Sequence, residues 1–385
     1  MFDAALRAVA GRAAVESHLA QVPGSSFPVV FAVGKAASSM ARGARAVLGG
    51  AIQQMLVITK TGHADPELAA VPGITLLESA HPLPDARSLA AGAELVRRLQ
   101  GLASAVRPLF LISGGSSSLV EALREGVTFE ELLALNERGL AAGWDIAQLN
   151  TRRASLSLLK GGGVARLLGT RRALALFISD VPGDDVDVIG SGLLGHDSGQ
   201  ADSIERHVIA NVEGAVRGAL DAAAAHGLSF EAGARRFDGE AAEVAARFVG
   251  ALRETSADGL VWGGESTVRL PGRPGRGGRN THLALAAARL LRAGESSSIL
   301  AAGTDGTDGP TEDAGAIVDS GSVERAELAG CDVERAFREF DSGLALEAAE
   351  DLVHTGPTGT NVGDLLIGIK HSAKSLRGLA EPRML

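Results

Sequence analysis

The chain repeats one local pattern, in which a short apolar run passes directly into a glycine-bearing loop and then into a helical stretch. In the first half these runs cover residues 28–33, 55–59, 74–78, 109–112 and 173–178, which is the length of buried strands rather than of helices. Strands that alternate with helices form a parallel sheet covered on both faces. The repeat therefore predicts an α/β fold with ligand-binding loops at the carboxyl ends of the strands.

The pattern returns in the second half at residues 260–262, 298–302 and 365–369. Residues 203–257 between the two halves are rich in alanine, and we predict that they are largely helical. A polar connection that contains glycine, at 227–238, suits a domain boundary. The 385 residues are 45% apolar, which is enough for two or three domain cores.

Composition excludes several classes of protein. The net charge of −9 argues against a general nucleic-acid or anionic-membrane surface. The single cysteine, Cys331, excludes an internal disulfide and a cysteine-based zinc cluster. No run approaches the ~20 apolar residues that span a bilayer, and the N-terminus lacks a secretory signal pattern. We therefore expect a cytoplasmic protein with no nucleic-acid partner and no membrane partner.

Two glycine-rich loops of the first half carry hydroxyl groups or cations. Ser113, Gly114, Gly115 and Ser116 follow the run at 109–112, and we predict a helix over residues 119–123 behind them. Backbone N–H groups at such a helix start bind anions, although a serine cap on a flexible turn is the alternative. Lys35 follows Gly34 directly after the first run. Further along the chain, Asn150 begins a segment with two arginines, and Lys160 precedes three glycines.

Two other loops are rich in aspartate. Asp180, Asp184 and Asp185 follow the run at 173–178, and Asp305 and Asp308 follow Gly303 and Thr304. Carboxylates of this kind hold Mg²⁺ or accept a proton from a substrate hydroxyl, and a solvated turn is the alternative in each case. We interpret His63 and His81 as residues that pack or cap loops.

Together these loops indicate phosphoryl transfer, which needs fixed cations, a metal and an oriented hydroxyl but little covalent chemistry by the protein. The sequence contains no G-x-x-x-x-G-K-[ST] loop, and the loop after the first run lacks G-x-G-x-x-G. Residues 114–118 also fail the G-x-S-x-G pattern of serine hydrolases.

The motifs, in their order along the chain, resemble the glycerate 2-kinases of the MOFRL type over nearly the whole length. The matching segments are 33–37, 113–117, 149–151, 160–162, 179–185, 263–267, 277–280, 303–309 and 356–361. The resemblance implies a larger Rossmann-like domain over 1–232, a smaller C-terminal α/β (MOFRL) domain over 233–385, and an active cleft between them. It also implies transfer of the ATP γ-phosphate to the 2-hydroxyl of D-glycerate, or of a related small hydroxy acid, with Mg²⁺.

The resemblance carries roles onto individual residues. It implies that Lys35 and Arg279 bind the transferring phosphoryl group and the substrate carboxylate, and that Asp180 and Asp305 complete the catalytic set. It implies metal binding by Asp184 and Asp308. The residues that it assigns to substrate or nucleotide binding are Gly34, Ser113, Gly114, Gly115, Ser116, Asn150, Lys160, Glu265, Asn280, Thr304 and Asn361.

The chain departs from the family pattern at five positions, which are Ala154, Ser155, Leu193, Thr281 and His282. These departures bear on the acceptor and leave two alternatives open. One is a hydroxypyruvate or tartronate-semialdehyde reductase, an older name within this family, against which the missing dinucleotide motif argues. The other is a non-catalytic member that binds nucleotide without turnover. A homodimer is also left open.

Overall fold

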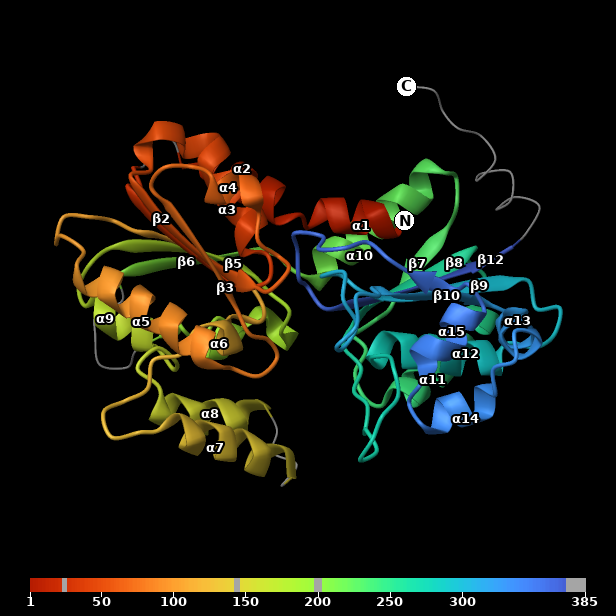
Figure 1. Ribbon diagram of the computed structural model, residues 1–385. Helices are drawn as coiled ribbons and strands as arrows, with labels where there is room; N and C mark the ends of the chain where they lie inside the picture. The colour runs from red at the N-terminus through yellow and green to blue at the C-terminus, as the bar shows by residue number, and fades with distance from the viewer. Residues whose placement is uncertain (23–25, 142–145, 197–202, 372–385) are drawn as a thin grey trace. The chain divides into compact units, whose positions relative to one another are not determined.

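The computed structural model describes residues 1–22, 26–141, 146–196 and 203–371, and the chain divides into two compact units. The parallel-sheet unit comprises the described residues of 10–211 together with 359–361, and the mixed-sheet unit comprises residues 1–9, 212–358 and 362–371. The chain therefore passes between the units more than once. Each unit is built around one sheet (Figure 1).

The sheet of the parallel-sheet unit has the strand order β3-β2-β1-β4-β5-β6, and all neighbouring strands run parallel. Its four central strands are almost wholly buried apolar runs, because helices cover both faces. The strands are β1 (Val29–Val33), β2 (Gln54–Lys60), β3 (Ile74–Ser79), β4 (Leu109–Ile112), β5 (Ala173–Ile178) and β6 (Ile204–Ala210). This arrangement confirms the predicted Rossmann-like parallel sheet.

In Figure 1, α2 and α3 lie on one face of this sheet, and α5, α6 and α9 lie on the other. The helices of the unit are α2 (Gly11–Ala20), α3 (Ala37–Leu48), α4 (Pro66–Ala69), α5 (Ala86–Gln100), α6 (Ser116–Leu119), α7 (Phe129–Ala141), α8 (Ile146–Leu156) and α9 (Gly163–Leu168), with single 3-10 turns at Gly49–Ala51, Pro182–Asp184 and Ile189–Ser191.

The sheet of the mixed-sheet unit has the order β11-β10-β9-β12-β8-β7. Strands β7 and β8 pair in parallel, whereas the other neighbours are antiparallel. The strands are β7 (Phe230–Ala232), β8 (Gly259–Gly264), β9 (Ser297–Gly303), β10 (Gly315–Asp319), β11 (Leu352–Val353) and β12 (Asp364–Lys370). The second α/β region expected from the sequence is therefore confirmed, with a sheet of mixed direction.

Helices α11 and α12 pack together beneath this sheet, and α1 packs on α10 on its other side (Figure 1). A buried core of small and aliphatic side chains joins α11, α12 and the central strands. The helices of the unit are α1 (Phe2–Ala8), α10 (Val212–Ala225), α11 (Ala241–Glu254), α12 (Arg279–Leu290), α13 (Ser322–Leu328), α14 (Val333–Arg338) and α15 (Ser342–Ala348).

The predicted helix over 119–123 is wrong. Helix α6 ends at Leu119, and Val120 is extended. The chain beyond it bonds to other segments instead, because Glu121 N donates to Ser88 O at 3.0 Å and Leu158 N donates to Ala122 O at 2.7 Å. These two bonds turn the side chain of Glu121 toward a buried site that is described below.

The prediction of a largely helical stretch over 203–257 is correct for α10 and α11 but misses β6 and β7. Strand β6 is an edge strand with half-exposed polar residues, so it lacks the apolar run by which the other strands were found. The chain passes from the parallel-sheet unit to the mixed-sheet unit between Asn211 and Val212, because α10 packs on α1, β7 and β8. The boundary between residues 232 and 233 stays a prediction about the domains.

Candidate active site

The loops after β1 and β4 meet where the strand order of the parallel sheet reverses. Strand β1 has β2 on one side and β4 on the other, so the two loops leave the sheet in opposite directions and open a crevice. They are bonded together, because Lys35 N donates to Gly114 O at 3.0 Å and Ala36 N donates to Ser113 Oγ at 3.0 Å. The predicted cation loop and the predicted glycine-serine loop thus form one structure.

Glycine is required at two positions of this structure. Gly34 has φ +135°, and a Cβ there would overlap Ser113. A Cβ on Gly114 would overlap the side chains of both Asp180 and Asn361. Asp180 follows β5, and its Oδ2 accepts a hydrogen bond of 2.9 Å from Asn361 Nδ2. Three segments distant in the sequence therefore converge on the backbone of Gly114.

The side chain of Lys35 lies beside Gly115. A Cβ placed on Gly115 would be 3.1 Å from Lys35 Cγ and 3.1 Å from His81 Cδ2, so the lysine and the histidine flank this residue. Both side chains are half-buried. His63 Nδ1 lies 3.4 Å from the carbonyl oxygen of Lys35. His63 thus packs against the loop as expected, whereas His81 also reaches the site.

A polar pocket of about 160 Å³ opens at Gly115 within the parallel-sheet unit. We call it the Gly115 pocket. Of the residues expected to bind ligand, Gly115 and Lys160 line it, and the sequence interpretation missed the others. The described residues that line it are His81, Pro82, Pro84, Gly115, Ser117, Ser118, Glu121, Leu132, Arg153 and Lys160.

The charges in this pocket are partly compensated within the protein. Lys160 and Glu121 are each 1% exposed, and their side chains form an ion pair. Glu121 Oε1 also accepts hydrogen bonds from Ser157 Oγ at 2.5 Å and Ala122 N at 3.1 Å. Burial lowers the pKa of Lys160, against the attraction of Glu121. Burial also lowers the pKa of the half-buried Arg153, with Glu121 acting in the opposite direction.

Hydroxyl groups connect the glycine-serine loop to α8. Ser117 Oγ and Ser191 Oγ lie 2.6 Å apart, and Ser191 Oγ donates to Asn150 Oδ1 at 2.9 Å. Asn150 therefore positions Ser191, which in turn contacts Ser117. The buried Ser116 Oγ has no hydrogen-bond partner in the described part of the chain. It is a donor and an acceptor that a bound ligand or water can satisfy.

Asp184 is the candidate metal ligand that the structure supports best. Its Oδ2 accepts a hydrogen bond of 2.6 Å from Asn211 Nδ2, whereas its buried Oδ1 has no partner among the described residues. The described residues hold no group of three or more His, Cys, Asp or Glu that could bind a metal by themselves. Mg²⁺ commonly takes only one or two carboxylates and completes its shell with water and substrate phosphates, so Asp184 alone fits it.

The aspartate loop of the mixed-sheet unit is bonded internally. Asp308 is 1% exposed, and its two oxygens accept bonds from Asn280 N at 2.9 Å and Thr281 N at 2.7 Å. It thereby caps the N-terminus of α12. Burial raises the pKa of Asp308 to about 6, against these two hydrogen bonds. Asp305 Oδ1 accepts a bond of 2.9 Å from Thr307 N, and the metal role expected of Asp308 stays a prediction.

Thr304 closes the same loop onto the start of β12. Its N and Oγ1 both donate to Gly363 O, at 2.9 and 2.6 Å, and its Oγ1 accepts a bond of 2.9 Å from Val362 N. Three backbone groups are therefore satisfied by one residue. The neighbouring Asn280 is 1% exposed, and its Oδ1 has no partner within the described ranges.

Arg279 begins α12 and is held by two carboxylates. Its Nε donates to Asp364 Oδ2 at 2.7 Å and its Nη2 to Asp364 Oδ1 at 3.1 Å, while Nη1 pairs with Glu265. Desolvation acts to lower the pKa of Arg279, but the charges of Asp364 and Glu265 outweigh it and raise that pKa. The guanidinium is one-third exposed and stays charged, with its plane fixed by Asp364. The sequence interpretation missed Asp364, because it lies 85 residues beyond its partner.

Three of the positions that depart from the family pattern hold residues that pack in a buried environment or bond at the start of a helix. His282 is 2% exposed and stacks on Phe337 and Phe340, at centroid distances of 4.5 and 4.2 Å. Thr281 bonds to Gly278 at the start of α12. Leu193 is 1% exposed and belongs to the core of the parallel-sheet unit.

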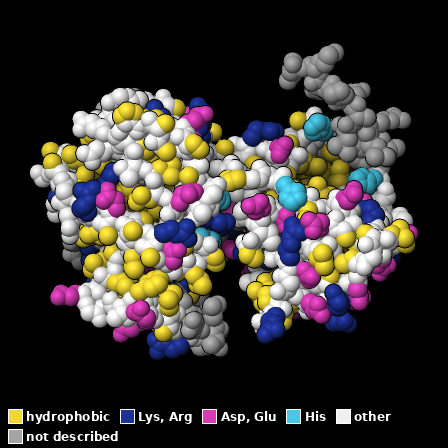
Figure 2. Space-filling model, viewed as in Figure 1, with side chains coloured by type: hydrophobic (Ala, Val, Ile, Leu, Met, Phe, Trp, Pro, Cys, Tyr) yellow, Lys and Arg dark blue, Asp and Glu magenta, His cyan; other side chains and the backbone are white. Residues whose placement is uncertain are grey.

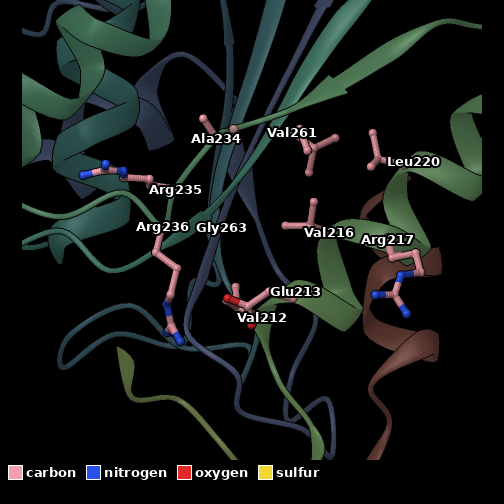
Figure 3. A pocket seen from close by; sticks show the side chains of 12 residues that line it. Val212, Glu213, Val216, Arg217, Leu220, Ala234, Arg235, Arg236, Val261 and Gly263 are labelled. Carbon is pink, nitrogen blue, oxygen red and sulfur yellow. The ribbon is translucent and has the colours of Figure 1, made fainter. Parts of the chain in front are cut away.

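The mixed-sheet unit has a second, more apolar pocket of about 320 Å³ between α10 and strands β7 and β8 (Figure 3). Val216 from α10 and Val261 from β8 lie on facing sides of it, and Arg235 and Arg236 follow β7 at its rim. None of the expected site residues is among the described residues that line it.

On the face shown in Figure 2, Lys and Arg side chains are interspersed with Asp and Glu, so this face offers no continuous basic surface. Among the described helices, none combines the length and the apolar character that crossing a membrane requires.

Comparison with known proteins adds independent findings. A family model described as a domain of unknown function (DUF4147) matches residues 1–221, and the MOFRL family model matches residues 259–364. A D-glycerate 2-kinase from Thermotoga maritima is 35% identical, over 89% of this chain and 90% of that protein. A crystal structure of a glycerate kinase from Thermotoga maritima matches with a TM-score of 0.84 at 34% identity, covering 95% of this chain and 97% of the other. A protein from Agrobacterium vitis, provisionally named hydroxypyruvate reductase, is 34% identical over 95% of this chain and 92% of its own length.

Proposed function

Because the chain belongs to the glycerate 2-kinase family, which joins a DUF4147 region to a MOFRL region, we propose that phosphoryl transfer takes place at the loops after β1 and β4. The protein is a glycerate kinase, a phosphotransferase with an alcohol group as acceptor. We propose D-glycerate as the acceptor, its 2-hydroxyl as the nucleophile and ATP as the donor. The altered positions Leu193, Thr281 and His282 do not argue against this acceptor, because each is occupied by core packing or helix capping.

The convergence of Lys35, Gly114 and Asp180 at the reversal of the strand order carries this proposal. In it, the ammonium group of Lys35 is a fixed positive charge for the oxygens of the transferring group. Asp180, oriented by Asn361, accepts the proton of the acceptor hydroxyl. The hydroxyl oxygen forms the new bond to the γ-phosphorus while the bond to the β–γ bridging oxygen breaks, and ADP leaves with that electron pair.

Mg²⁺, when bound, neutralises charge on the β- and γ-phosphates. In our proposal Asp184 would hold it through the carboxylate oxygen that lacks a partner among the described residues. Ser113 and Ser116 provide hydroxyl and backbone groups for anion binding beside Gly114 and Gly115.

Within the mixed-sheet unit, Arg279 is the second cation for which we propose a role. We assign to Arg279, whose guanidinium is held in one orientation by Asp364, the binding of the transferring phosphoryl group or of an acceptor carboxylate. Glu265 orients Arg279, and Asn280 offers an amide oxygen that has no partner among the described residues. Asp305 and Thr304 shape the loop beside them.

The proposal is tested by ADP release from purified protein supplied with Mg²⁺ and ATP. D-glycerate is compared with L-glycerate, tartronate and a control without acceptor, and phosphorus NMR identifies the position of the phosphoryl group in the product. We expect turnover with D-glycerate and a 2-phosphoglycerate product. Stabilisation by nucleotide without turnover would favour the non-catalytic alternative, and NADH oxidation with hydroxypyruvate would favour the reductase.

A further inference from the structure

The turn at residues 190–192 has a left-handed backbone throughout. Gly190, Ser191 and Gly192 have φ angles of +59°, +58° and +66°. Glycine adopts this region without strain, whereas a residue with a Cβ is strained there. Ser191 therefore stands where glycine would be the favoured residue, and such strained positions are found preferentially at functional sites.

This turn is fitted to the glycine-serine loop after β4. A Cβ on Gly190 would overlap the buried Ser116 Oγ, so glycine leaves room for that hydroxyl. The next residue of the turn meets the next serine of the loop, because Ser191 Oγ lies 2.6 Å from Ser117 Oγ. Ser191 O also accepts a bond of 3.0 Å from Gly161 N. The strained conformation of Ser191 is therefore held by contacts with two other loops.

The hydrogen bonds of Ser191 fix the direction of the Ser117 hydroxyl. A serine hydroxyl has one hydrogen to donate and two lone pairs that accept. Ser191 donates its hydrogen to Asn150 Oδ1 at 2.9 Å, so toward Ser117 it is an acceptor. The hydrogen of Ser117 therefore points to Ser191, and the Ser117 oxygen keeps only lone pairs for other partners.

Ser117 is among the described residues that line the Gly115 pocket, whereas Ser191 is 5% exposed and is not. An oxygen whose hydrogen is already donated accepts hydrogen bonds and cannot give one. It suits a hydroxyl group, which has a hydrogen to donate, and not an ionised carboxylate or phosphate oxygen, which has none. The ligand group that suits Ser117 is therefore a hydroxyl.

We propose that Ser191 is a positioning residue of the kinase reaction, which orients Ser117 to accept a hydrogen bond from a substrate hydroxyl. This proposal rests on the proposed kinase function. Hydroxyl groups are present on D-glycerate and on the ribose of ATP, and the measurements below distinguish these two sources.

The first test separates the hydroxyl of Ser191 from its Cβ. Ser191→Ala and Ser191→Gly both remove the hydroxyl, but only Ser191→Gly also removes the Cβ that is strained at positive φ. We expect kcat/KM to fall by the same factor in both, roughly 3- to 10-fold for one lost neutral hydrogen bond. The melting temperature of Ser191→Gly should exceed that of Ser191→Ala by roughly 2–4 °C. Activity that instead rises and falls with the melting temperature indicates a purely structural role and overturns the proposal.

The second test is a double-variant cycle. Ser117→Ala should show the same loss as Ser191→Ala, and the double variant should lose no more than either single variant, because both remove one hydrogen bond. Additive losses overturn the proposal. Ser203→Ala is the control, since its hydroxyl donates to Arg171 O at 2.8 Å outside the Gly115 pocket, and its turnover should match that of the wild type.

The direction of the hydrogen bonds is tested at Asn150. Asn150→Asp can still accept the hydrogen of Ser191, whereas Asn150→Ala cannot, so Asn150→Asp should retain at least ~3-fold more kcat/KM. Equal losses in the two variants would mean that Asn150 does not receive this hydrogen, which overturns the proposal.

The two KM values of Ser191→Ala identify the hydroxyl. A rise in KM for D-glycerate alone assigns it to the acceptor, and a rise in KM for ATP alone assigns it to the ribose. No change in either KM or in kcat overturns the proposal. If the wild type does not phosphorylate D-glycerate, the proposed function is wrong. Calorimetry of D-glycerate and of ATP binding to the wild type and Ser191→Ala then decides the positioning role separately, and equal affinities for both ligands, or no binding, overturn it.

Discussion

The two units place the same kind of sequence, an apolar strand followed by glycine and aspartate, in different settings. After β5, the carboxylate of Asp180 meets Gly114 and Asn361, and the neighbouring loop opens into the Gly115 pocket. After β9, Asp308 binds the backbone of α12, and Thr304 binds the start of β12. The polar groups of the loops after β4 and β5 lie at or near the Gly115 pocket. Most polar groups of the loop after β9 are hydrogen-bonded to other segments of the protein.

The difference shows that the role of an aspartate loop depends on which other segments of the chain pack against it. In the parallel sheet, all strands end at one edge and their loops gather around the reversal of strand order. In the mixed sheet, the start of β12 and the start of α12 reach the loop after β9 and occupy its polar atoms. Substitutions in the first region should therefore reduce turnover, and those in the second should reduce stability.

The largest effect on stability is expected from Lys160→Ala. Lys160 lies in the parallel-sheet unit, but its side chain is paired with another residue of the protein. The substitution leaves the buried carboxylate of Glu121 without its cation, which costs about 3–5 kcal/mol of unfolding free energy. Urea denaturation measures this loss. The double variant Lys160→Met with Glu121→Gln should recover most of it, and a single variant within ~1 kcal/mol of the wild type would contradict the internal role.

Lys35→Ala should lower turnover by at least ~10²-fold, because a fixed charge at the transferring group is lost. Its melting temperature should equal that of Arg97→Ala, a control in which an exposed arginine of the same unit is removed. Steady-state ADP release and thermal unfolding check both points. Near-normal turnover in Lys35→Ala would remove Lys35 from the mechanism.

His282, in the mixed-sheet unit, should make the free energy of unfolding depend on pH. Burial and the positive charge of Arg289 lower the pKa of His282 to about 4, so the folded protein resists its protonation. The unfolded chain takes up the proton near its ordinary pKa of 6.5, so stability is present above pH 6.5 and is lost as pH falls toward about 4. Because one pKa unit corresponds to 1.36 kcal/mol, the loss of unfolding free energy approaches roughly 3 kcal/mol. His282→Phe lacks this loss, so a stability difference from the wild type that stays constant across the window would refute it.

Asp308→Asn should have the smallest effect, about 1 kcal/mol at pH 7, since an amide oxygen retains part of the cap on α12. The raised pKa of Asp308 means that the folded state binds its proton more tightly than the unfolded chain does. The contribution of wild-type Asp308 is therefore greatest below its ordinary pKa of 3.8 and declines as pH rises to about 6. Unfolding of both proteins between pH 4 and 7 checks the direction, which is opposite to that of His282. Turnover of Asp308→Asn should stay near that of the wild type, and a loss as large as that of Lys35→Ala would break the comparison.

Much of the fold could be predicted from the local pattern of apolar residues, because a buried strand coincides with an apolar run of the same length. The runs at 109–112 and 173–178 match β4 and β5 residue for residue. Strand β6 could not be found in this way, since an edge strand needs no apolar face on both sides. The helix expected at 119–123 failed because backbone bonds to α5 and to residue 158 outweighed its helical propensity.

The candidate site was predictable in its composition. Glycine, lysine, serine and aspartate at the ends of apolar runs identify Lys35, the 113–116 loop and Asp180 without any structure. The sequence alone could not show which polar groups are already satisfied, because hydrogen-bond partners are set by chain segments that pack together from far apart. Lys160 and Asp308 were both interpreted as ligand-binding residues, and the structure pairs them with Glu121 and with the backbone of α12.

The sequence by itself determined the α/β class, the family and the loops that carry polar chemistry, since these depend on residue type and spacing along the chain. Only the tertiary structure decided that Arg153, His81 and Ser117 share one pocket with Lys160. It also decided that Asn361 orients Asp180 across 181 positions of sequence. The physical reason is that local pattern reports which backbone state a segment prefers, whereas a site is made of side chains whose distances and burial depend on how the strands are ordered in the sheet.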